Sequence, residues 1–242
     1  MARPARPPSD SPESDLSHLV DLVRSTVPPI DRAGLPFIGG ALGVAAVGAR
    51  HRWVRNTALA TAAACAAFFR NPGRVPPSQP GVVVSPADGQ VTLIDEALPP
   101  PELGLPATPM PRVSIFLSLF DAHTQRAPVG GEVITVKHRP GIFLSADRDE
   151  ASDRNERNSL WLRTSEGHDI AVVQIAGLVA RRIVCHTHPG AKLTLGETYG
   201  LIRFGSRLDT YLPPGSQIGV RIGQRAVAGE TVLAELPSRV TP

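Results

Sequence analysis

Lysine is almost absent from this chain of 242 residues, in which Lys137 and Lys192 are the only two. Enzymes that use pyridoxal phosphate hold it on a lysine, so this composition disfavours them. Arginine supplies the remaining basic charge, and 22 acidic residues leave a net charge of +3. This balance suits phosphate or an anionic membrane surface, although coding rich in G and C produces the same bias. No nucleic-acid partner is predicted.

Other residues and motifs are also scarce. The two cysteines, Cys65 and Cys185, stand in apolar surroundings without partner spacing, which predicts a reduced, cytosolic context. Cys185 with His186 and His188 could ligate a metal, but a Pro-Gly turn follows directly and no second ligand pair stands at a zinc-site spacing. No metal is therefore predicted. No serine lies in a G-x-S-x-G nucleophile elbow, which argues against a serine hydrolase.

Long apolar runs are missing too. Residues 35–49 and 57–69 are apolar, but each run is shorter than the roughly 20 residues that span a bilayer upright. The segment between them, residues 50–56, is rich in arginine and contains Trp53, which suits a lipid-headgroup location. We predict a membrane-associating helical hairpin that is interfacial, re-entrant or tightly spanning. A helical hairpin buried within a soluble fold is the alternative.

These signals divide the chain into four parts. Residues 1–15 are rich in proline, serine and charge and are predicted to form a disordered tail, without a signal peptide. Residues 16–69 form the membrane-associating helical segment, and residues 70–80 form a proline-rich linker. In residues 81–242, short apolar runs are divided by Gly, Pro and Asp, which predicts a β-rich catalytic domain.

Two internal echoes refine the fold. The stretch SPADGQVTLI at 85–94 resembles APVGGEVITV at 127–136, and GAKLTLGET at 190–198 resembles GQRAVAGET at 223–231. The second pair also resembles the turn-strand unit of lipoyl and biotinyl carrier domains, but neither lysine lies at a suitable hairpin tip. The echoes predict a mainly β (α+β) fold: a duplicated antiparallel β-sandwich of interleaved hairpins with an N-terminal apolar helical hairpin. Coincidence between short Gly- and Val-rich stretches is the alternative.

The stretch YGLIRFGSRLDTYLP at 199–213 resembles a buried strand interrupted by Gly205-Ser206 between two arginines. A serine hydroxyl can attack the carbonyl of a preceding glycine, which has no Cβ to block the approach. β-Elimination of the resulting ester leaves dehydroalanine, and hydrolysis of this gives a pyruvoyl group at a new N-terminus. That carbonyl can form an imine with a substrate amine and accept the electrons released on decarboxylation, as pyridoxal phosphate does elsewhere.

Six blocks between residue 68 and the C-terminus stand in one order: FFRNPGR (68–74), SPADGQV (85–91), FLSLFDAHTQRAPVGG (116–131), NERN (155–158), QIAGLVARRIVC (174–185) and GLIRFGSRLDTYLP (200–213). Together they resemble the short, bacterial-type phosphatidylserine decarboxylase proenzymes. The apolar hairpin before Phe68 also resembles the N-terminal membrane segment of that family.

The resemblance implies a zymogen that cleaves itself between Gly205 and Ser206. Residues 1–205 would become the β chain and residues 206–242 the α chain. The two chains would form a heterodimer, and further assembly into a homo-oligomer stays possible. Ser206 would become the pyruvoyl cofactor that forms a Schiff base with the substrate. The implied reaction is decarboxylation of phosphatidylserine to phosphatidylethanolamine, a step of phospholipid biosynthesis. The implied location is the cytoplasmic side of the cell membrane, peripheral or hairpin-anchored.

Asp88 and His123 match family positions associated with processing and proton transfer. A histidine can activate the Ser206 hydroxyl while an aspartate orients the histidine, and His123 could later protonate the carbanion. Longer family members carry a second histidine where Arg126 stands here, so His123 serves both steps or leaves one to another group. An ordinary Asp-Gly turn and a core histidine are the structural alternatives.

Four arginines are candidates for binding the lipid phosphate: Arg181, Arg182, Arg203 and Arg207. Solvated strand-edge charges are the alternative for each. NERN is expected to close a loop near the site. Two other functions compete with phosphatidylserine decarboxylation: a pyruvoyl decarboxylase of another serine-headed lipid, of the archaetidylserine type, and a non-catalytic membrane-bound β-sandwich adaptor.

Overall fold

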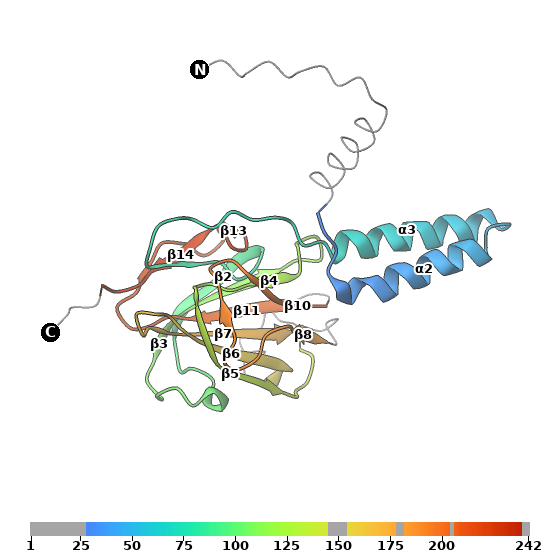
Figure 1. Cartoon of the computed structure of the whole chain (residues 1–242). Coiled ribbons are helices and arrows are strands. Elements are labelled where there is room, and N and C mark those ends of the chain that lie inside the picture. The colour runs from blue at the N-terminus through green and yellow to red at the C-terminus, as the bar shows by residue number, and fades with distance from the viewer. Residues whose placement is uncertain (1–27, 145–153, 178–181, 204–205, 239–242) are drawn as a thin grey trace, which may run out of the picture.

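The structure is a computed structural model that describes residues 28–144, 154–177, 182–203 and 206–238 (Figure 1). The predictions for the tail at 1–15, for Arg181 and for Gly205 lie outside these residues. A hairpin of two helices projects from a body built of strands (Figure 1). The mainly β fold with an N-terminal helical hairpin is therefore confirmed.

The hairpin consists of α2 (Leu35–Val47) and α3 (Arg52–Phe68), preceded by the 3-10 helix η1 (Arg32–Gly34). Alanine-rich sequence favours both helices, and a proline in the first turn of α2 suits a helix start. At the root of the hairpin, a Cβ on Gly34 would lie 2.5 Å from Cγ of Phe69, so only glycine fits there. Within the described ranges, no helix has both the length and the apolar character to cross a membrane.

The strands form three antiparallel sheets. The large sheet has eight strands, in the order β13 (Arg225–Ala226), β2 (Gly89–Ala97), β3 (Met110–Leu117), β11 (Ser206–Tyr211), β7 (Asp169–Ala176), β6 (Arg157–Arg163), β5 (Gly131–Arg139) and β9 (Lys192–Leu193). One small sheet contains β1 (Val82–Val84), β14 (Val232–Glu235) and β12 (Gln217–Ile218). The other contains β4 (Thr124–Arg126), β10 (Thr198–Ile202) and β8 (Ile183–Cys185). A second 3-10 helix, η2 (Pro101–Leu103), precedes β3.

The large sheet is symmetric about the boundary between its two central strands, β11 and β7. Counting outward, β3, β2 and β13 on one side correspond to β6, β5 and β9 on the other. The echoed sequences occupy equivalent places: Gly89 of β2 lies opposite Ala226, and Gly131 of β5 lies opposite Leu193. The predicted duplication therefore corresponds to two interleaved halves.

The backbone hydrogen bonds repeat in the same way. The amide of Gly190 donates to the Val133 carbonyl at 2.7 Å, and the amide of Gly223 donates to the Val91 carbonyl at 2.8 Å. Both glycines have positive φ, 84° and 88°, which a side chain would strain. Equivalent positions in the two echoes thus carry the same turn for the same reason.

The main hydrophobic core takes side chains from all three sheets, including Val83, Ile202 and Leu208. A second, smaller cluster, which contains Val173 and Tyr211, covers the opposite face of the large sheet together with η2. Because strand side chains alternate between faces, the two clusters define an inner and an outer face of β11. Ser206 shares the inner face with Leu208, whereas Arg207 points to the outer face.

Candidate active site

Ser206 is the first residue of β11, at the centre of the large sheet. It pairs with Leu117 at the end of β3 and with Ala176 at the end of β7. The residue is fully buried, and its Oγ has no hydrogen-bond partner within the described parts of the chain. A buried hydroxyl without a partner is costly, and such groups often mark reactive sites.

The carbonyl of Ala176, beside Ser206, is held by the NERN segment. Asn155 donates through Nδ2 to the Ala176 carbonyl at 2.8 Å. The same side chain bonds both the amide and the carbonyl of Leu144, at 2.9 and 2.8 Å. Asn155 of NERN therefore contacts the end of the strand that pairs with Ser206.

His123 lies just before β4 and is almost fully buried. Its Nδ1 is 2.9 Å from the carbonyl oxygen of Asp121, and its Nε2 has no partner within the described residues. A carbonyl can only accept a hydrogen bond, so Nδ1 carries the proton and Nε2 carries a lone pair in the neutral ring. Sequence analysis missed Asp121, because the group that orients the imidazole belongs to the backbone.

The environment of His123 keeps the imidazole neutral. Burial is the largest influence and lowers its pKa from 6.5 to about 4, and the positive charge of Arg70 acts in the same direction. The bond to the Asp121 carbonyl and the charges of Asp121 and Asp88 act in the opposite direction and only partly compensate. At neutral pH, His123 is therefore a base with a free lone pair on Nε2.

Two segments connect His123 with Ser206 along the chain. The amide of Ile202, at the end of β10, donates to the His123 carbonyl at 3.3 Å, and the chain then continues toward Ser206. On the other side, Leu117 pairs with Ser206, and the chain continues from there to His123. β4 and β10 lie side by side as a hydrogen-bonded pair (Figure 1).

The carboxylate of Asp88 binds Arg74 and Ala228 rather than His123. Its Oδ2 accepts from Nη2 of Arg74 at 2.6 Å, and its Oδ1 accepts from the amide of Ala228 at 2.8 Å. Among the described residues, Asp88 has no hydrogen bond to His123. The contact that a Ser-His-Asp arrangement would require is thus replaced by the Asp121 carbonyl, and Asp88 acts on the histidine through its charge.

The carboxylate of Asp121 is fixed as firmly as its carbonyl. It accepts from Nη2 of Arg225 at 2.5 Å and from the amide and Oγ of Ser118, both at 2.8 Å. Burial raises the pKa of Asp121, but the bonds from Arg225 and Ser118 outweigh burial and leave the pKa below its usual value. The ionised side chain holds the turn that aims the Asp121 carbonyl at His123.

Arg126, at the position where the family resemblance implies a second histidine in longer members, binds the linker. Its guanidinium donates to Oδ1 of Asn71 at 2.8 Å and to the carbonyls of Pro72 and Gly196, at 2.7 and 2.8 Å. These contacts fix the segment between the hairpin and the sandwich. Arg126 therefore has a structural position and no free proton to exchange near neutral pH.

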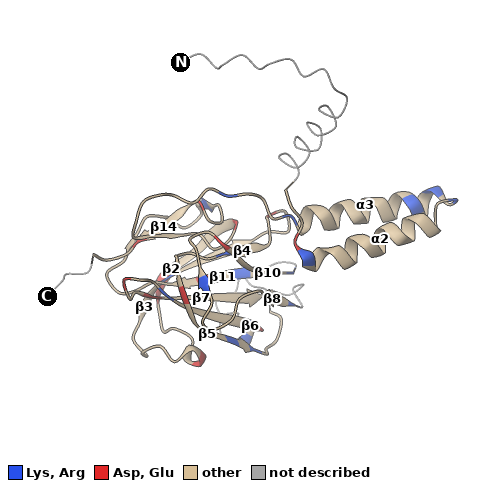
Figure 2. Cartoon of the chain, in the orientation of Figure 1, with Lys and Arg blue, Asp and Glu red and all other residues tan. Residues whose placement is uncertain are grey.

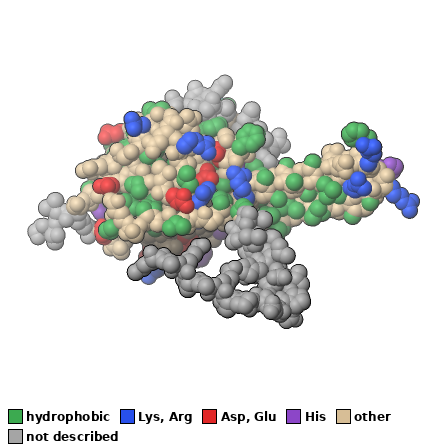
Figure 3. All heavy atoms as spheres, turned by 90° about the horizontal axis from the view of Figure 1, so that it is seen from above, with side chains coloured by type: hydrophobic (Ala, Val, Ile, Leu, Met, Phe, Trp, Pro, Cys, Tyr) green, Lys and Arg blue, Asp and Glu red, His purple; other side chains and the backbone are tan. Residues whose placement is uncertain are grey.

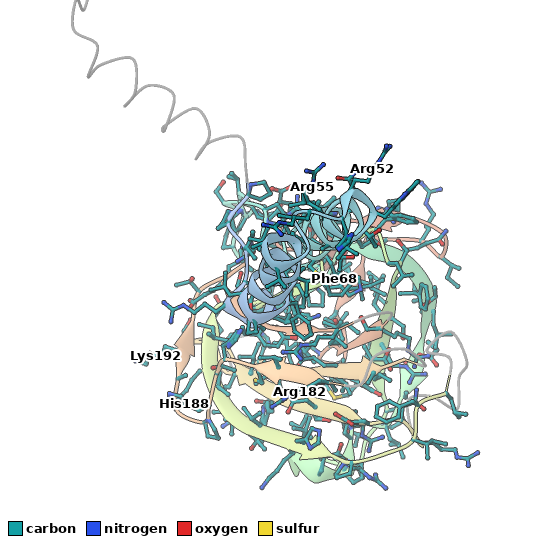
Figure 4. All side chains as sticks on the ribbon, turned by 90° about the vertical axis from the view of Figure 1, so that its right-hand side faces the viewer. Arg52, Arg55, Phe68, Arg182, His188 and Lys192 are labelled. Carbon is teal, nitrogen blue, oxygen red and sulfur yellow. The ribbon has the colours of Figure 1, made fainter. Side chains whose placement is uncertain are left out.

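The FFRNPGR block joins the hairpin to the site. The ring of Phe68 lies against the imidazole of His123, with ring centroids 4.1 Å apart. Arg70 donates to the Phe120 carbonyl at 2.7 Å, and Arg74 makes the ion pair with Asp88. The end of α3 thus forms one wall of the site, and Figure 4 shows Phe68 between the hairpin and the strands.

Arg207 does not lie with Ser206. It points to the outer face of β11, where its Nε and Nη2 donate to the two carboxylate oxygens of Asp209 at 2.8 and 2.9 Å. Both side chains are buried, and Arg112 lies 3.6 Å from the same carboxylate. The alternation of side chains along a strand could have revealed this separation from the sequence.

Arg203 and Arg182 lie together at the root of the hairpin. The amide of Arg203 donates to the Arg182 carbonyl at 3.2 Å, and the Arg203 guanidinium lies 5.1 Å from the ring centroid of Phe37. Burial and the charge of Arg182 lower the pKa of Arg203. Arg182 is exposed on the side that faces the hairpin, as Figure 4 shows. Arg203 stands three residues before Ser206 in the sequence, so the two arginines place positive charge near that serine.

An apolar cavity of about 490 Å³ opens beside this wall. It is lined by Thr61, Ala64, Cys65, Ala67, Phe68, Phe69, Arg70, Leu119 and Phe120. Leu119 and Phe120 are 56% and 88% exposed, which is unusual for large apolar side chains so close together. The cavity reaches Phe68, whose ring contacts His123. A hydrophobic chain could therefore lie next to the candidate site.

Comparison with known proteins gives one consistent result. A family model described as Phosphatidylserine decarboxylase matches residues 61–234. A phosphatidylserine decarboxylase proenzyme of Mycobacteroides abscessus is 66% identical over 237 residues, covering 98% of this chain and 100% of the relative. The proenzyme of Mycobacterium marinum is 63% identical, covering 97% and 99%, and that of Rhodococcus jostii is 60% identical, covering 98% and 100%.

Proposed function

Because the chain belongs to the phosphatidylserine decarboxylase family, we propose that it cleaves its own Gly205–Ser206 bond and then decarboxylates phosphatidylserine to phosphatidylethanolamine. The chain is a decarboxylase by family, which does not fit a non-catalytic adaptor. The observation that carries the proposal is a pair of buried atoms without partners in the described structure, Oγ of Ser206 and Nε2 of His123. A nucleophile and a base need such free atoms.

In self-cleavage, His123 takes the proton of the Ser206 hydroxyl through Nε2. The oxygen attacks the Gly205 carbonyl, and the proton passes to the departing amide nitrogen, which leaves an ester. β-Elimination releases the carboxylate of Gly205 and leaves dehydroalanine at position 206. Addition of water and loss of ammonia then give the pyruvoyl end. The neutral state of His123, with its pKa lowered to about 4, suits this role.

Ser206 fits the pyruvoyl group because its side chain is buried and unpartnered on the inner face of β11. This group supplies an electrophilic carbonyl that holds the substrate amine and takes up the electrons released with carbon dioxide. His123 is the residue that we assign to carry a proton to the substrate carbon afterwards: its Nε2 can accept the proton that the substrate ammonium group gives up and return it to the carbon, while Asp121 and Phe68 fix the ring in place. One histidine thereby serves both steps, since Arg126 binds the linker.

Substrate binding is assigned to the root of the hairpin. Arg203 and Arg182 bind the lipid phosphate, because they combine positive charge with a place beside the segment that leads to Ser206. No arginine is assigned to the carboxylate of the substrate serine, since a tight ion pair would oppose its loss as carbon dioxide. Arg207 is excluded from this role by its buried pair with Asp209. An acyl chain extends into the cavity beside Phe68 and Phe120.

The hairpin holds the enzyme at the cytoplasmic side of the cell membrane. Its apolar side chains are exposed, with Val47 at 92% and Trp53 at 77%. Figure 3 shows hydrophobic side chains along the hairpin, and Figures 2 and 3 show basic residues at its far end. Trp53 and the neighbouring arginines suit the headgroup region. We infer that the hairpin lies in the membrane interface, with its root and the substrate arginines at the lipid surface.

A single measurement on purified protein tests self-cleavage. Intact-mass analysis is expected to give two chains, the smaller beginning at residue 206 with a pyruvoyl end, and a Ser206→Ala protein is expected to stay whole and inactive. Ser216→Ala is the matched control, because Gly215-Ser216 is a second Gly-Ser bond, in a turn. An uncleaved wild-type chain, or cleavage that survives Ser206→Ala, would overturn the proposal. Turnover of diacyl and diether phosphatidylserine side by side distinguishes the two lipid classes.

A further inference from the structure

Three side-chain amides connect the NERN segment to His123. Nδ2 of Asn158 donates to Oε1 of Gln174, and Nε2 of Gln174 donates to Oε1 of Gln125, both at 2.8 Å. Nε2 of Gln125 then donates to the carbonyl of His123, also at 2.8 Å. We call Asn158, Gln174 and Gln125 the amide relay.

The relay crosses from one sheet to another. Asn158 on β6 and Gln174 on β7 are directly opposite one another in the large sheet, whereas Gln125 belongs to β4 of a small sheet. Gln174 has room for this contact because Gly200 lies beside it: a Cβ on Gly200 would lie 3.2 Å from Nε2 of Gln174. All three amides are buried, with at most 3% exposure. The relay therefore spans the interior of the sandwich.

The direction of the relay is fixed at its His123 end. A backbone carbonyl only accepts, so Gln125 must turn its NH₂ group toward His123. Its Oε1 then faces Gln174, which must donate through its own NH₂ group. The Oε1 of Gln174 is thereby turned toward Asn158, so Asn158 must also donate through its NH₂ group. Each amide is thus held in one orientation, and successive bonds in such a chain reinforce one another.

We propose that the amide relay positions His123 for self-cleavage at Ser206, an inference that rests on the proposed function. The His123 carbonyl accepts from Gln125 and from Ile202, at the end of the strand that leads to Ser206. The relay therefore holds the backbone of the base at the end of β10, while the Asp121 carbonyl holds its ring. The three amides are positioning residues and do not touch the reacting atoms.

The first test removes the last bond of the relay. Gln125→Met keeps the length of the side chain but cannot donate to His123. The full chain is synthesised in a cell-free system, and the precursor is followed over time on a denaturing gel. We expect cleavage to slow by about tenfold or more, because a base displaced by about 1 Å loses much of its effect.

The second test acts from the far end of the relay. A carboxylate in Asn158→Asp only accepts, so Gln174 must turn its NH₂ group toward it and then presents Oε1 to Gln125. If Gln125 turns in response, its own Oε1 faces the His123 carbonyl. Asn158→Asp should therefore slow cleavage although it is remote from His123. In the double variant with Gln125→Met the rate should equal that of Gln125→Met alone, because both changes act through one bond.

A third variant provides a readout that a general loss of stability would not produce. In Gln125→Glu, the ionised carboxylate repels the His123 carbonyl, but the protonated carboxyl can donate to it through O–H. Cleavage by this variant should accelerate as the pH falls from about 8 to 5, because burial raises the pKa of a carboxyl group. The wild-type rate should stay flat in this range, since the pKa of His123 is about 4. Gln90→Glu, at an exposed amide that donates to Gly223, is the matched control and should also stay flat.

Two results would overturn the relay: unchanged cleavage in Gln125→Met, or independent, multiplying effects of Asn158→Asp and Gln125→Met. If the methionine variant fails to fold, a flat pH profile for Gln125→Glu would overturn the relay instead. Failure of the proposed function looks different, because the wild-type chain itself would then stay uncleaved or would be cut at another bond.

Discussion

The imidazole of His123 lies against the ring of Phe68, with centroids 4.1 Å apart, so the last turn of the helical hairpin forms a wall of the candidate active site. Phe68 also lines the apolar cavity at the root of the hairpin. One side chain thus borders both the base and the space assigned to an acyl chain. On the proposed function, the position of the hairpin on the lipid would therefore be coupled to the environment of the base.

Replacement of Phe68 should raise the pKa of His123. Burial is the main cause of its low pKa of about 4, and Phe68→Ala admits water to one side of the ring. We expect the pKa to move toward 6.5, measured by NMR titration of the imidazole C–H signals in the uncleaved Ser206→Ala background. Phe68→Leu is the control that keeps an apolar cover. Identical titration curves for both variants would contradict the assigned cause.

The stability of the uncleaved chain should fall between pH 6.5 and 4. His123 has a pKa of about 4 when folded and 6.5 as its ordinary value, so the unfolded chain binds the proton more readily. The contribution of His123 to the free energy of unfolding is therefore fully present above pH 6.5 and is lost as the pH falls. The loss reaches on the order of 3 kcal/mol once the pH is below about 4. Urea unfolding of Ser206→Ala at pH 7 and 5 measures the loss. The double variant Ser206→Ala with His123→Gln should not show this pH-dependent loss of stability. An equal pH dependence in both proteins would refute the assignment to His123.

Replacement of Arg126 by histidine should not restore a second catalytic histidine. The change removes three hydrogen bonds to Asn71, Pro72 and Gly196, so we expect a loss of about 2–3 kcal/mol in the free energy of unfolding. Denaturant unfolding measures this loss. Arg139→His, on the exposed end of β5, is the control and should stay within about 0.5 kcal/mol of wild type. Faster cleavage in Arg126→His would show that the position is catalytic after all.

Replacement of Arg203 should weaken substrate binding, whereas replacement of Arg207 should destabilise the fold. Arg203→Ala should cleave itself but show a KM for phosphatidylserine in vesicles raised by about tenfold, because it loses a phosphate contact. Arg207→Met should instead destabilise the fold by about 3 kcal/mol, because it leaves Asp209 buried without its main partner. Steady-state kinetics and thermal unfolding, run on both variants, separate the two roles. A KM effect confined to Arg207→Met would reverse our assignment.

A polar residue at position 120 should affect long-chain substrate most. Phe120 is 88% exposed and lines the apolar cavity, so Phe120→Asn should lower activity on long-chain phosphatidylserine in vesicles by about tenfold. Activity on a short-chain, soluble phosphatidylserine should change much less. Val75→Asn, at another exposed apolar residue, is the control. An equal loss on both substrates would place Phe120 in the chemistry of the site rather than in chain binding.

Much of the fold was accessible from sequence because repetition is a strong signal. The echo at 85–94 and 127–136 marks two strands that occupy equivalent places, and the glycines at 190 and 223 take the same positive φ. The surroundings of His123 were less accessible. Its orienting partner is the carbonyl of Asp121, and a backbone group leaves no trace in residue type. Asp88 matched the family block, but its carboxylate binds Arg74 and the Ala228 amide, which lie 14 and 140 residues away along the chain.

The placement of β11 determines what the proposed cut before Ser206 would do to the molecule. This strand, which would be the first of the small chain, is hydrogen-bonded along its length to β3 and β7, which would belong to the large chain. Further along, β13 remains paired with β2, and β14 with β1. The fragments are interwoven and cannot come apart without dismantling the centre of the large sheet. Maturation would change the covalent connectivity and leave the architecture intact, with the new chain end locked in the middle of the protein.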